Sequence, residues 1–218
     1  MTDYVTMQTR IASELSDDGA LTVAQIKAAI QSAIKHYERK PFFFNQKKES
    51  TFSTVASQEY YAAAANADIP YIEKMDGFTI GSSKKPVTKV DFSAIDNAQT
   101  GSITGEPTSY AYYDQKIRLY PIPSAVYTAT MAYIYRLTAL SADGDTNAWM
   151  TEGEELIRQA AKRDICTNVL IDDAGIARYG NREVEVFDEL KAETARRMES
   201  SLRVDWPFGN TSTEDWRQ

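Results

Sequence analysis

Cysteine and histidine are almost missing from this chain of 218 residues, which has one of each. Disulfides and the common structural zinc sites need two or more such residues, so neither is expected. Cys166 falls in an apolar helical stretch without a partner, and we expect the chain to fold in the cytosol. His36, the one imidazole on which a nucleophilic triad would depend, comes late in a helical stretch, where a structural role is favoured.

Long apolar runs and an excess of positive charge are missing too. No stretch approaches eighteen apolar residues, and Met1–Tyr4 does not resemble the start of an export signal, so no membrane contact is predicted. The 24 basic residues against 31 acidic ones give a net charge of −7. Such a surface repels phosphates, so the chain is a poor candidate for wrapping DNA but would let DNA pass close by.

Apolar residues with helical spacing occur near the N-terminus. Tyr4 and Met7 belong to a first predicted helix, and a second begins at Thr22, which has the spacing of a capping box with Gln25. Pro41 is expected to end this second helix. The N-terminal part of the chain is therefore predicted to be helical.

The middle of the chain, from about residue 42 to 140, loses this periodicity and becomes rich in Tyr, Phe, Thr and Val. Alternating apolar residues on both sides of Asp114-Gln115 predict a hairpin, and a further strand is expected from Tyr127 to Leu137. Val90 and Phe92 share one face of another expected strand. This region is predicted to be an antiparallel β-rich insert.

Helical spacing returns near the C-terminus. Thr151 and Glu154 have the spacing of a second capping box, and the helix that follows is expected to end near Gly175. A last helix is predicted from about Arg182 to Ser200. The remaining residues are polar and aperiodic, yet they hold large aromatic side chains typical of contact sites. The alternative is a tail folded back on its own domain. The predicted partner-binding residues are Trp206, Pro207, Phe208 and Trp216.

These patterns predict an α+β fold. Its expected parts are a four-helix body made by residues 1–41 and 141–201, and a β-rich inserted lobe at 42–140. Residues 202–218 are expected to form an extended C-terminal tail that docks on a partner. Body and lobe would offer two different surfaces to neighbouring molecules.

One local pattern resembles a calcium-binding loop. Asp143, Asp145, Asn147 and Glu154 have the spacing of oxygen ligands in such a loop, but Ala148 stands where the loop needs glycine. An Asp-rich turn before a capped helix is therefore favoured, and no metal or cofactor is predicted.

Thirteen tyrosines also suggest a platform for stacking single-stranded nucleic acid. The interleaved lysines and arginines that such a platform needs are missing, so sheet faces and subunit contacts are favoured.

The predicted hairpin and its surroundings resemble the head-to-tail adaptors of tailed bacteriophages. The segment from Gly105 to Pro123, GEPTSYAYYDQKIRLYPIP, is similar to the central hairpin of that family. Upstream, QIK at 25–27, HYER at 36–39 and FFFN at 42–45 resemble its second helix and aromatic exit. Downstream, LSAD at 140–143, NAWM at 147–150 and GEELI at 153–157 resemble the start of its third helix. The resemblance covers about Ile11 to Ile165.

This resemblance implies a non-enzymatic structural protein of the virion, located at the head–tail junction and assembled in the host cytoplasm. The implied partners are the portal protein, a tail nozzle or tail tube protein, and further copies in a dodecameric ring. The implied ring assembles after packaging, its C-terminal segments reach onto the portal, and DNA passes through its lumen without specific binding.

A second hypothesis is a virion-associated peptidoglycan hydrolase that uses paired carboxylates. The candidate residues are Glu152, Glu154 and Glu155, since two carboxylates can cleave a glycosidic bond by acid–base chemistry. They fall in the first turn of a predicted helix, where the helix dipole stabilises acidic side chains, and this favours a structural role.

Overall fold

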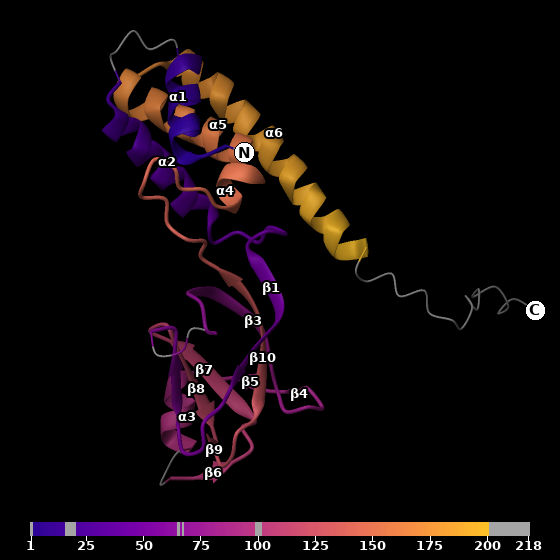
Figure 1. Cartoon of the computed structure of the whole chain (residues 1–218). Coiled ribbons are helices and arrows are strands. Elements are labelled where there is room, and N and C mark those ends of the chain that lie inside the picture. Colours follow the sequence, from indigo (N-terminus) through magenta and orange to yellow (C-terminus); the bar gives the residue numbers. More distant parts are fainter. Residues whose placement is uncertain (1, 16–20, 65, 67, 99–101, 201–218) are drawn as a thin grey trace, which may run out of the picture.

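The structure is a computed structural model that describes residues 2–15, 21–64, 66, 68–98 and 102–200. A helical part and a β-rich part lie at opposite ends of the molecule (Figure 1). This mixture of helix and strand confirms the predicted α+β class. The helices are α1 (Tyr4–Glu14), α2 (Val23–Tyr37), α3 (Phe92–Ala98), α4 (Ala148–Thr151), α5 (Glu154–Ile165), the π-helical turn η1 (Cys166–Leu170) and α6 (Asp173–Ser200).

The strands form three sheets in the described residues. Sheet A has the order β1-β10-β3-β4, sheet B has the order β2-β8-β7-β5, and β6 pairs with β9. The strands are β1 (Gln46–Ser53), β2 (Tyr60–Ala62), β3 (Ile72–Ile80), β4 (Lys85–Pro86), β5 (Thr88–Lys89), β6 (Thr104–Gly105), β7 (Ser109–Tyr113), β8 (Lys116–Tyr120), β9 (Ile122–Pro123) and β10 (Thr128–Tyr135).

The helical part is organised around α5, which packs against α1, α2 and α6. The predicted capping box at the start of α2 is present, because Thr22 and Gln25 bond each other's backbone N–H groups. Burial of the apolar stripes stabilises this part. Its buried core includes Tyr4, Met7, Ile11, Ile26, Ile30, Tyr37, Phe42, Trp149, Met150, Leu156, Ile157, Ala161 and Ile165.

The predicted cap of α5 is wrong, and the four-helix body is not confirmed. The described residues form six α-helices, of which α3 lies among the strands (Figure 1). Thr151 does not cap α5, because it is the last residue of the short helix α4, whose own cap is Asn147.

Gly175 does not end a helix, and the last helix begins well before Arg182. The chain turns earlier, at η1 and Ile171, and α6 starts at Asp173. A Cβ at Gly175 would lie 2.4 Å from Asp172 Oδ2 and 2.7 Å from Cys166 Sγ. Glycine is therefore required here by close packing between the turn and the first residues of α6.

The β-rich part is a sandwich in which sheets A and B enclose a second core. Phe78 of sheet A stacks on Tyr110 of sheet B with a ring separation of 5.0 Å, and Phe52 contacts Tyr61 across the same interface at 5.3 Å. Such aromatic pairs add to the stabilisation from apolar burial. The remaining core residues include Ile72, Met75, Ile80, Ile117, Leu119, Ala129, Met131 and Tyr133.

The predicted hairpin is confirmed as β7 and β8. Asp114 and Gln115 both have positive φ, at 51° and 56°, the two-residue turn that matches the twist of antiparallel strands. The insert is not wholly antiparallel, because β5 runs parallel to β7 and β6 runs parallel to β9. Phe92 does not continue a strand from Val90 either, since it begins α3.

The two parts meet where the chain crosses between them twice. Asn45 is fully buried, and its carbonyl accepts the backbone N–H of Tyr135 at the end of β10. Arg136 forms ion pairs with Glu38 after α2 and with Glu73 in β3. The expected boundaries at 41/42 and 140/141 remain predictions, and both Phe42 and Leu140 pack in the helical core.

Candidate interaction surfaces

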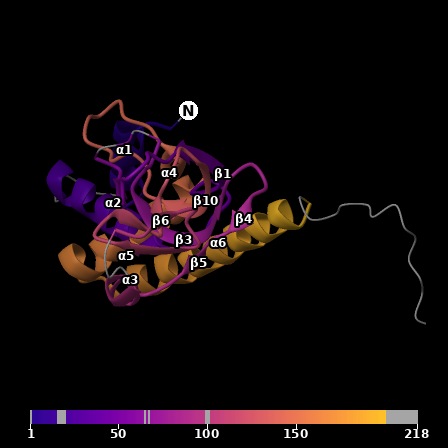
Figure 2. The ribbon, with the colours of Figure 1, turned by 90° about the horizontal axis from the view of Figure 1, so that it is seen from below.

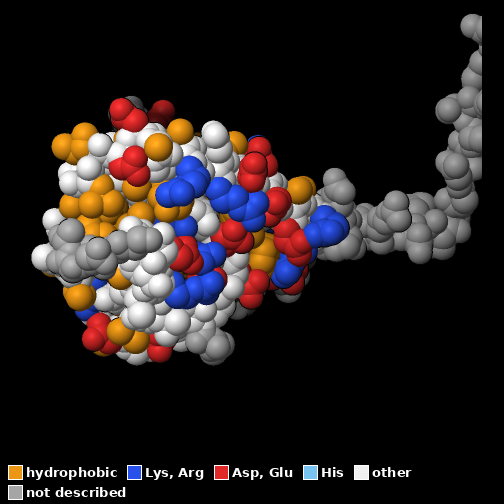
Figure 3. Space-filling model, turned by 90° about the horizontal axis from the view of Figure 1, so that it is seen from above, with side chains coloured by type: hydrophobic (Ala, Val, Ile, Leu, Met, Phe, Trp, Pro, Cys, Tyr) orange, Lys and Arg blue, Asp and Glu red, His pale blue; other side chains and the backbone are white. Residues whose placement is uncertain are grey.

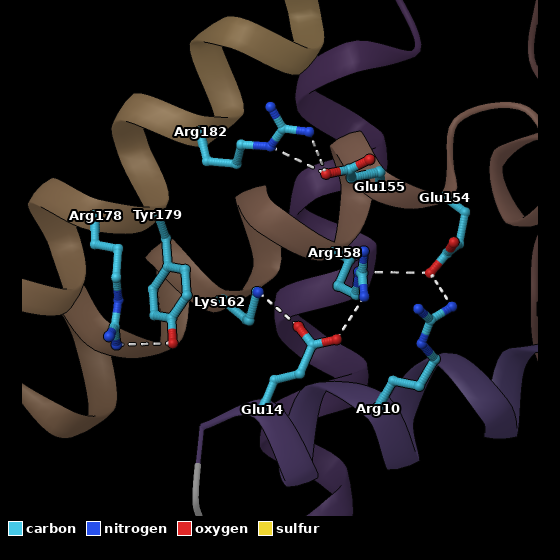
Figure 4. Close-up of polar contacts among 9 residues, drawn as sticks. All are labelled: Arg10, Glu14, Glu154, Glu155, Arg158, Lys162, Arg178, Tyr179 and Arg182. Atoms are coloured by element: carbon cyan, nitrogen blue, oxygen red, sulfur yellow. Dashed lines mark hydrogen bonds and ion pairs between the residues drawn. The ribbon is translucent and has the colours of Figure 1, made fainter.

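Two of the three carboxylates considered for acid–base chemistry, Glu154 and Glu155, are paired with cations (Figure 4). Glu154 lies 3.0 Å from Arg10 and 3.5 Å from Arg158, and Glu155 lies 2.8 Å from Arg182. Both carboxylates therefore take part in contacts between helices, Glu154 with Arg10 of α1 and Glu155 with Arg182 of α6. The arrangement therefore suits helix packing better than cleavage of a glycosidic bond.

Glu14 is the centre of the ion pairs that join α1 to α5. Its carboxylate accepts hydrogen bonds from Arg158 at 2.5 Å and from Lys162 at 2.7 Å (Figure 4). Burial raises the pKa of Glu14. The hydrogen bonds and charges of Lys162 and Arg158 together lower it by more than burial raises it, so the pKa of Glu14 lies below its usual range. Only 4% of the Lys162 side chain is exposed, so its ion pair with Glu14 is a partly buried contact between α1 and α5.

The four residues with calcium-loop spacing all have protein partners. Within the described ranges, no group of three or more His, Cys, Asp or Glu side chains is placed to hold a metal ion. Backbone hydrogen bonds from Ser141 and Ala142 lower the pKa of Asp145, which therefore closes an Asp-rich turn. The other partners are Lys27 for Asp143, the Trp149 backbone N–H for Asn147, and Arg10 and Arg158 for Glu154.

His36 and Cys166 lie in different elements and have structural surroundings. The His36 ring packs edge-on to Tyr37 at 4.8 Å. Cys166 is buried at the start of η1, and this burial raises the pKa of its thiol, which disfavours the reactive thiolate.

The tyrosines of the β-rich part divide between the sandwich core and its surface. Tyr61, Tyr110 and Tyr133 are buried between the sheets, whereas Tyr71 and Tyr113 are exposed. This pattern fits the expectation that many tyrosines serve sheet faces. The exposed ones leave the β-rich part with aromatic contact points.

An apolar groove opens where the helical part approaches the β-rich part. It lies between the second half of α2 and the extended residues 136–140, and its volume is about 250 Å³. We call it the α2 groove. Its lining includes the apolar residues Ile34, Leu137, Ala139, Leu140 and Trp149 and the charged residues Lys35, Glu38 and Arg136.

A second apolar feature is the turn between α5 and α6. Leu170 and Ile171 are both exposed there, and Ile171 has 81% of its surface accessible. Figure 3 shows apolar side chains gathered on this end of the helical part, beside a mixture of basic and acidic ones. Sequence patterns did not reveal this turn, because Leu170 and Ile171 read as a continuation of an apolar helical stretch.

The predicted docking residues Trp206, Pro207, Phe208 and Trp216 lie outside the described residues. No helix in the described part is long and apolar enough to cross a membrane.

Comparison with known proteins decides the family. The family model described as SU10 adaptor protein matches residues 2–207. The chain belongs to this family. The SU10 adaptors are a phage head–tail adaptor family, so the family predicted from the hairpin and its flanking motifs is confirmed. The SU10 adaptor match also includes α6, beyond the part covered by those motifs. A comparison with curated proteins finds no match.

Proposed function

We propose that this SU10 adaptor is a non-enzymatic ring subunit that joins the portal vertex of a phage head to the tail and lines the DNA exit channel. The observation that carries the proposal is the family match over residues 2–207. The proposed partners are the portal protein, a tail nozzle or tail tube protein, and further copies of the chain in a dodecameric ring. The protein would be assembled in the host cytoplasm and remain at the head–tail junction.

The arrangement of the molecule supports a role in assembly. A ring needs two different complementary surfaces on each subunit, and this chain offers separate surfaces on its helical and β-rich parts (Figure 1). Two candidate carboxylates of the alternative hydrolase hypothesis, Glu154 and Glu155, are held by Arg10, Arg158 and Arg182, which favours the adaptor. A net charge of −7 suits a channel through which DNA passes without being held.

The C-terminal residues are the proposed contact with the portal. Helix α6 passes along one side of the molecule and extends beyond the other helices (Figures 1 and 2). Residues 202–218 come after this helix in the sequence and include the proposed aromatic anchors Trp206, Phe208 and Trp216. Buried aromatic anchors dominate many protein interfaces, so these side chains are proposed to supply most of the binding energy.

Removal of residues 202–218 tests the proposal. The truncated protein should keep its circular dichroism spectrum but lose co-sedimentation with purified portal rings. A full-length variant with Trp206→Ala and Phe208→Ala should bind at least about tenfold more weakly, because truncating a hot-spot residue costs about 2 kcal/mol or more. A matched control is Val126→Ser, which removes an exposed apolar side chain from the β-rich part.

Retained portal binding by the truncated protein would disprove the anchor role. Failure of the full-length protein to bind portals, together with its absence from the neck of virions in electron micrographs, would disprove the adaptor function itself.

A further inference from the structure

The turn between α5 and α6 holds an unfavourable backbone conformation. Ile171 has φ 52° and ψ 49°, in the left-handed region. For a β-branched residue this conformation is an outlier, because its Cβ substituents crowd the backbone. The π-helical turn η1 precedes it directly, and π-helical turns occur often at functional sites. Glycine or asparagine would fit this position with less strain.

The Ile171 side chain buries little surface within its own chain, so burial does not offset this strain. It is 81% exposed, and Leu170 beside it is also exposed. An exposed apolar side chain contributes little to folding, and strain of this kind persists where the surroundings or the function require it. The residue therefore fits a contact outside its own chain.

Acidic side chains surround this apolar tip. Asp172 and Asp173 follow Ile171 directly and are exposed, and Asp164 lies seven residues before Ile171, in α5. Among the described residues, no ion pair joins any of these three carboxylates to a cation. A matching surface would be an apolar hollow with a cation at its rim.

The α2 groove has these properties. Its apolar lining includes Ile34, Leu137 and Trp149, and its volume of about 250 Å³ is large enough for the side chains of Leu170 and Ile171. Lys35 stands on its rim.

We propose that Leu170 and Ile171 of one copy enter the α2 groove of a second copy, with Asp172 and Asp173 facing Lys35. This inference rests on the proposed function, because it assigns a contact between subunits of the proposed ring. The α5–α6 turn lies at the end of the helical part away from the strands, whereas the groove lies where the two parts meet (Figure 1). A contact between two different surfaces can repeat from copy to copy and close into a ring.

The first experiment separates a contact from a purely structural role. Ile171→Gly removes the apolar side chain and relieves the left-handed strain, so the variant should melt at a higher temperature than the wild type. Its self-association, measured by sedimentation velocity over a concentration series, should weaken at least about tenfold. Val126→Ser is the matched control and should leave self-association unchanged. A variant that melts higher but associates like the wild type would overturn the proposal.

The second experiment tests which surfaces meet. Full-length Ile171→Cys and Ala139→Cys variants are mixed under mild oxidation, and the disulfide-linked product is analysed by mass spectrometry. The mixture should form a dimer through these two cysteines, while wild-type protein, whose Cys166 is buried, should not. If the mixture gives no such product, the contact is wrong. If the variants still bind portals in that case, the adaptor function stands independently of this contact.

Discussion

Arg118 in β8 connects α3 to sheet B. Its guanidinium lies 2.5 Å from Glu59 and also pairs with Asp96 of α3. The same group packs over the Phe92 ring at 4.5 Å. Only 6% of the side chain is exposed, so this arginine is a buried connection between α3 and sheet B.

Arg118→Ala should destabilise the fold by about 1–3 kcal/mol, because it removes the hydrogen bonds of a buried guanidinium to Glu59 and Asp96 and its contact with the Phe92 ring. Urea unfolding with a circular dichroism signal measures this loss. Arg118→Lys should recover part of the stability, since it keeps the charge but cannot reach both carboxylates. An unchanged midpoint for Arg118→Ala would show that the ion pairs do not hold α3.

Glu14 makes the attachment of α1 dependent on pH. Its folded pKa is lowered, so its stabilising contribution is present above the unfolded value of about 4.3 and is lost as the pH falls through the folded pKa. A third of the side chain is exposed, so after discounting for solvent the contribution is about 1 kcal/mol.

Glu14→Gln should therefore lower the melting temperature at pH 7 by about 2–4 °C. The difference from the wild type should shrink as the pH falls through the folded pKa of Glu14, because the wild-type carboxylate then becomes protonated too. Differential scanning calorimetry across this range checks the expectation. A difference that stays constant with pH would mean that packing, and not charge, accounts for the effect.

At the scale of elements, α6 contains two glycines, of which one has room for a larger side chain and the other does not. A Cβ at Gly175 would meet Asp172 and Cys166 at less than 3.0 Å, whereas a Cβ at Gly180 would make an ordinary contact of 3.6 Å with Arg163. Both positions are helical. Helix propensity alone would favour alanine at each, so packing decides the difference.

Gly180→Ala should stabilise the protein by about 0.5–1 kcal/mol, the usual gain in a helix interior. Gly175→Ala should destabilise it by about 1–3 kcal/mol, as overpacking does, because buried Cys166 cannot move away freely. Thermal melts of the two variants give the comparison. A change in melting temperature in the same direction for both variants would contradict the packing explanation.

The elements that could be predicted from sequence are those whose signals are local. The hairpin depends on Asp114 and Gln115 and on alternation within ten residues, and the start of α2 depends on Thr22 and Gln25. In contrast, α3 is short and is held by Arg118, about twenty residues away in the chain, so no local pattern indicated it. Local propensity is regularly overridden by such contacts.

The candidate surfaces were harder to predict than the fold. The α2 groove brings Ile34 together with Leu137 and Trp149, which are about a hundred residues apart in sequence from it. The exposure of Ile171 depends on its left-handed backbone conformation, which the apolar sequence around it does not predict. Both surfaces result from tertiary packing, which periodicity does not encode.

At the scale of the whole molecule, the two cores share few connections. The helical core and the sandwich core are separate sets of buried residues, and within the described ranges the chain passes between them near Asn45 and near Arg136. Few buried contacts between regions allow each region to open on its own. The two parts are therefore expected to differ in local stability.

A core variant in each part tests this expectation. Ile157→Ala should cost about 2–5 kcal/mol in the helical core, and Met131→Ala a similar amount in the sandwich. Native-state hydrogen exchange should show reduced protection mainly in the part that carries the substitution. Equal loss of protection in both parts would show that they unfold as one unit.

The length of helix α6 sets a distance along the molecule. Its 28 residues correspond to a rod about 42 Å long, because an α-helix rises about 1.5 Å per residue. Any molecule held by the residues that follow Ser200 would thus be kept at a set distance from the start of the rod. Removing four residues from it would draw that anchorage inward by about 6 Å while turning it by only about 40°. With the proposed portal contact in place, the distance between the portal and the rest of this subunit would depend on the number of helical turns in α6.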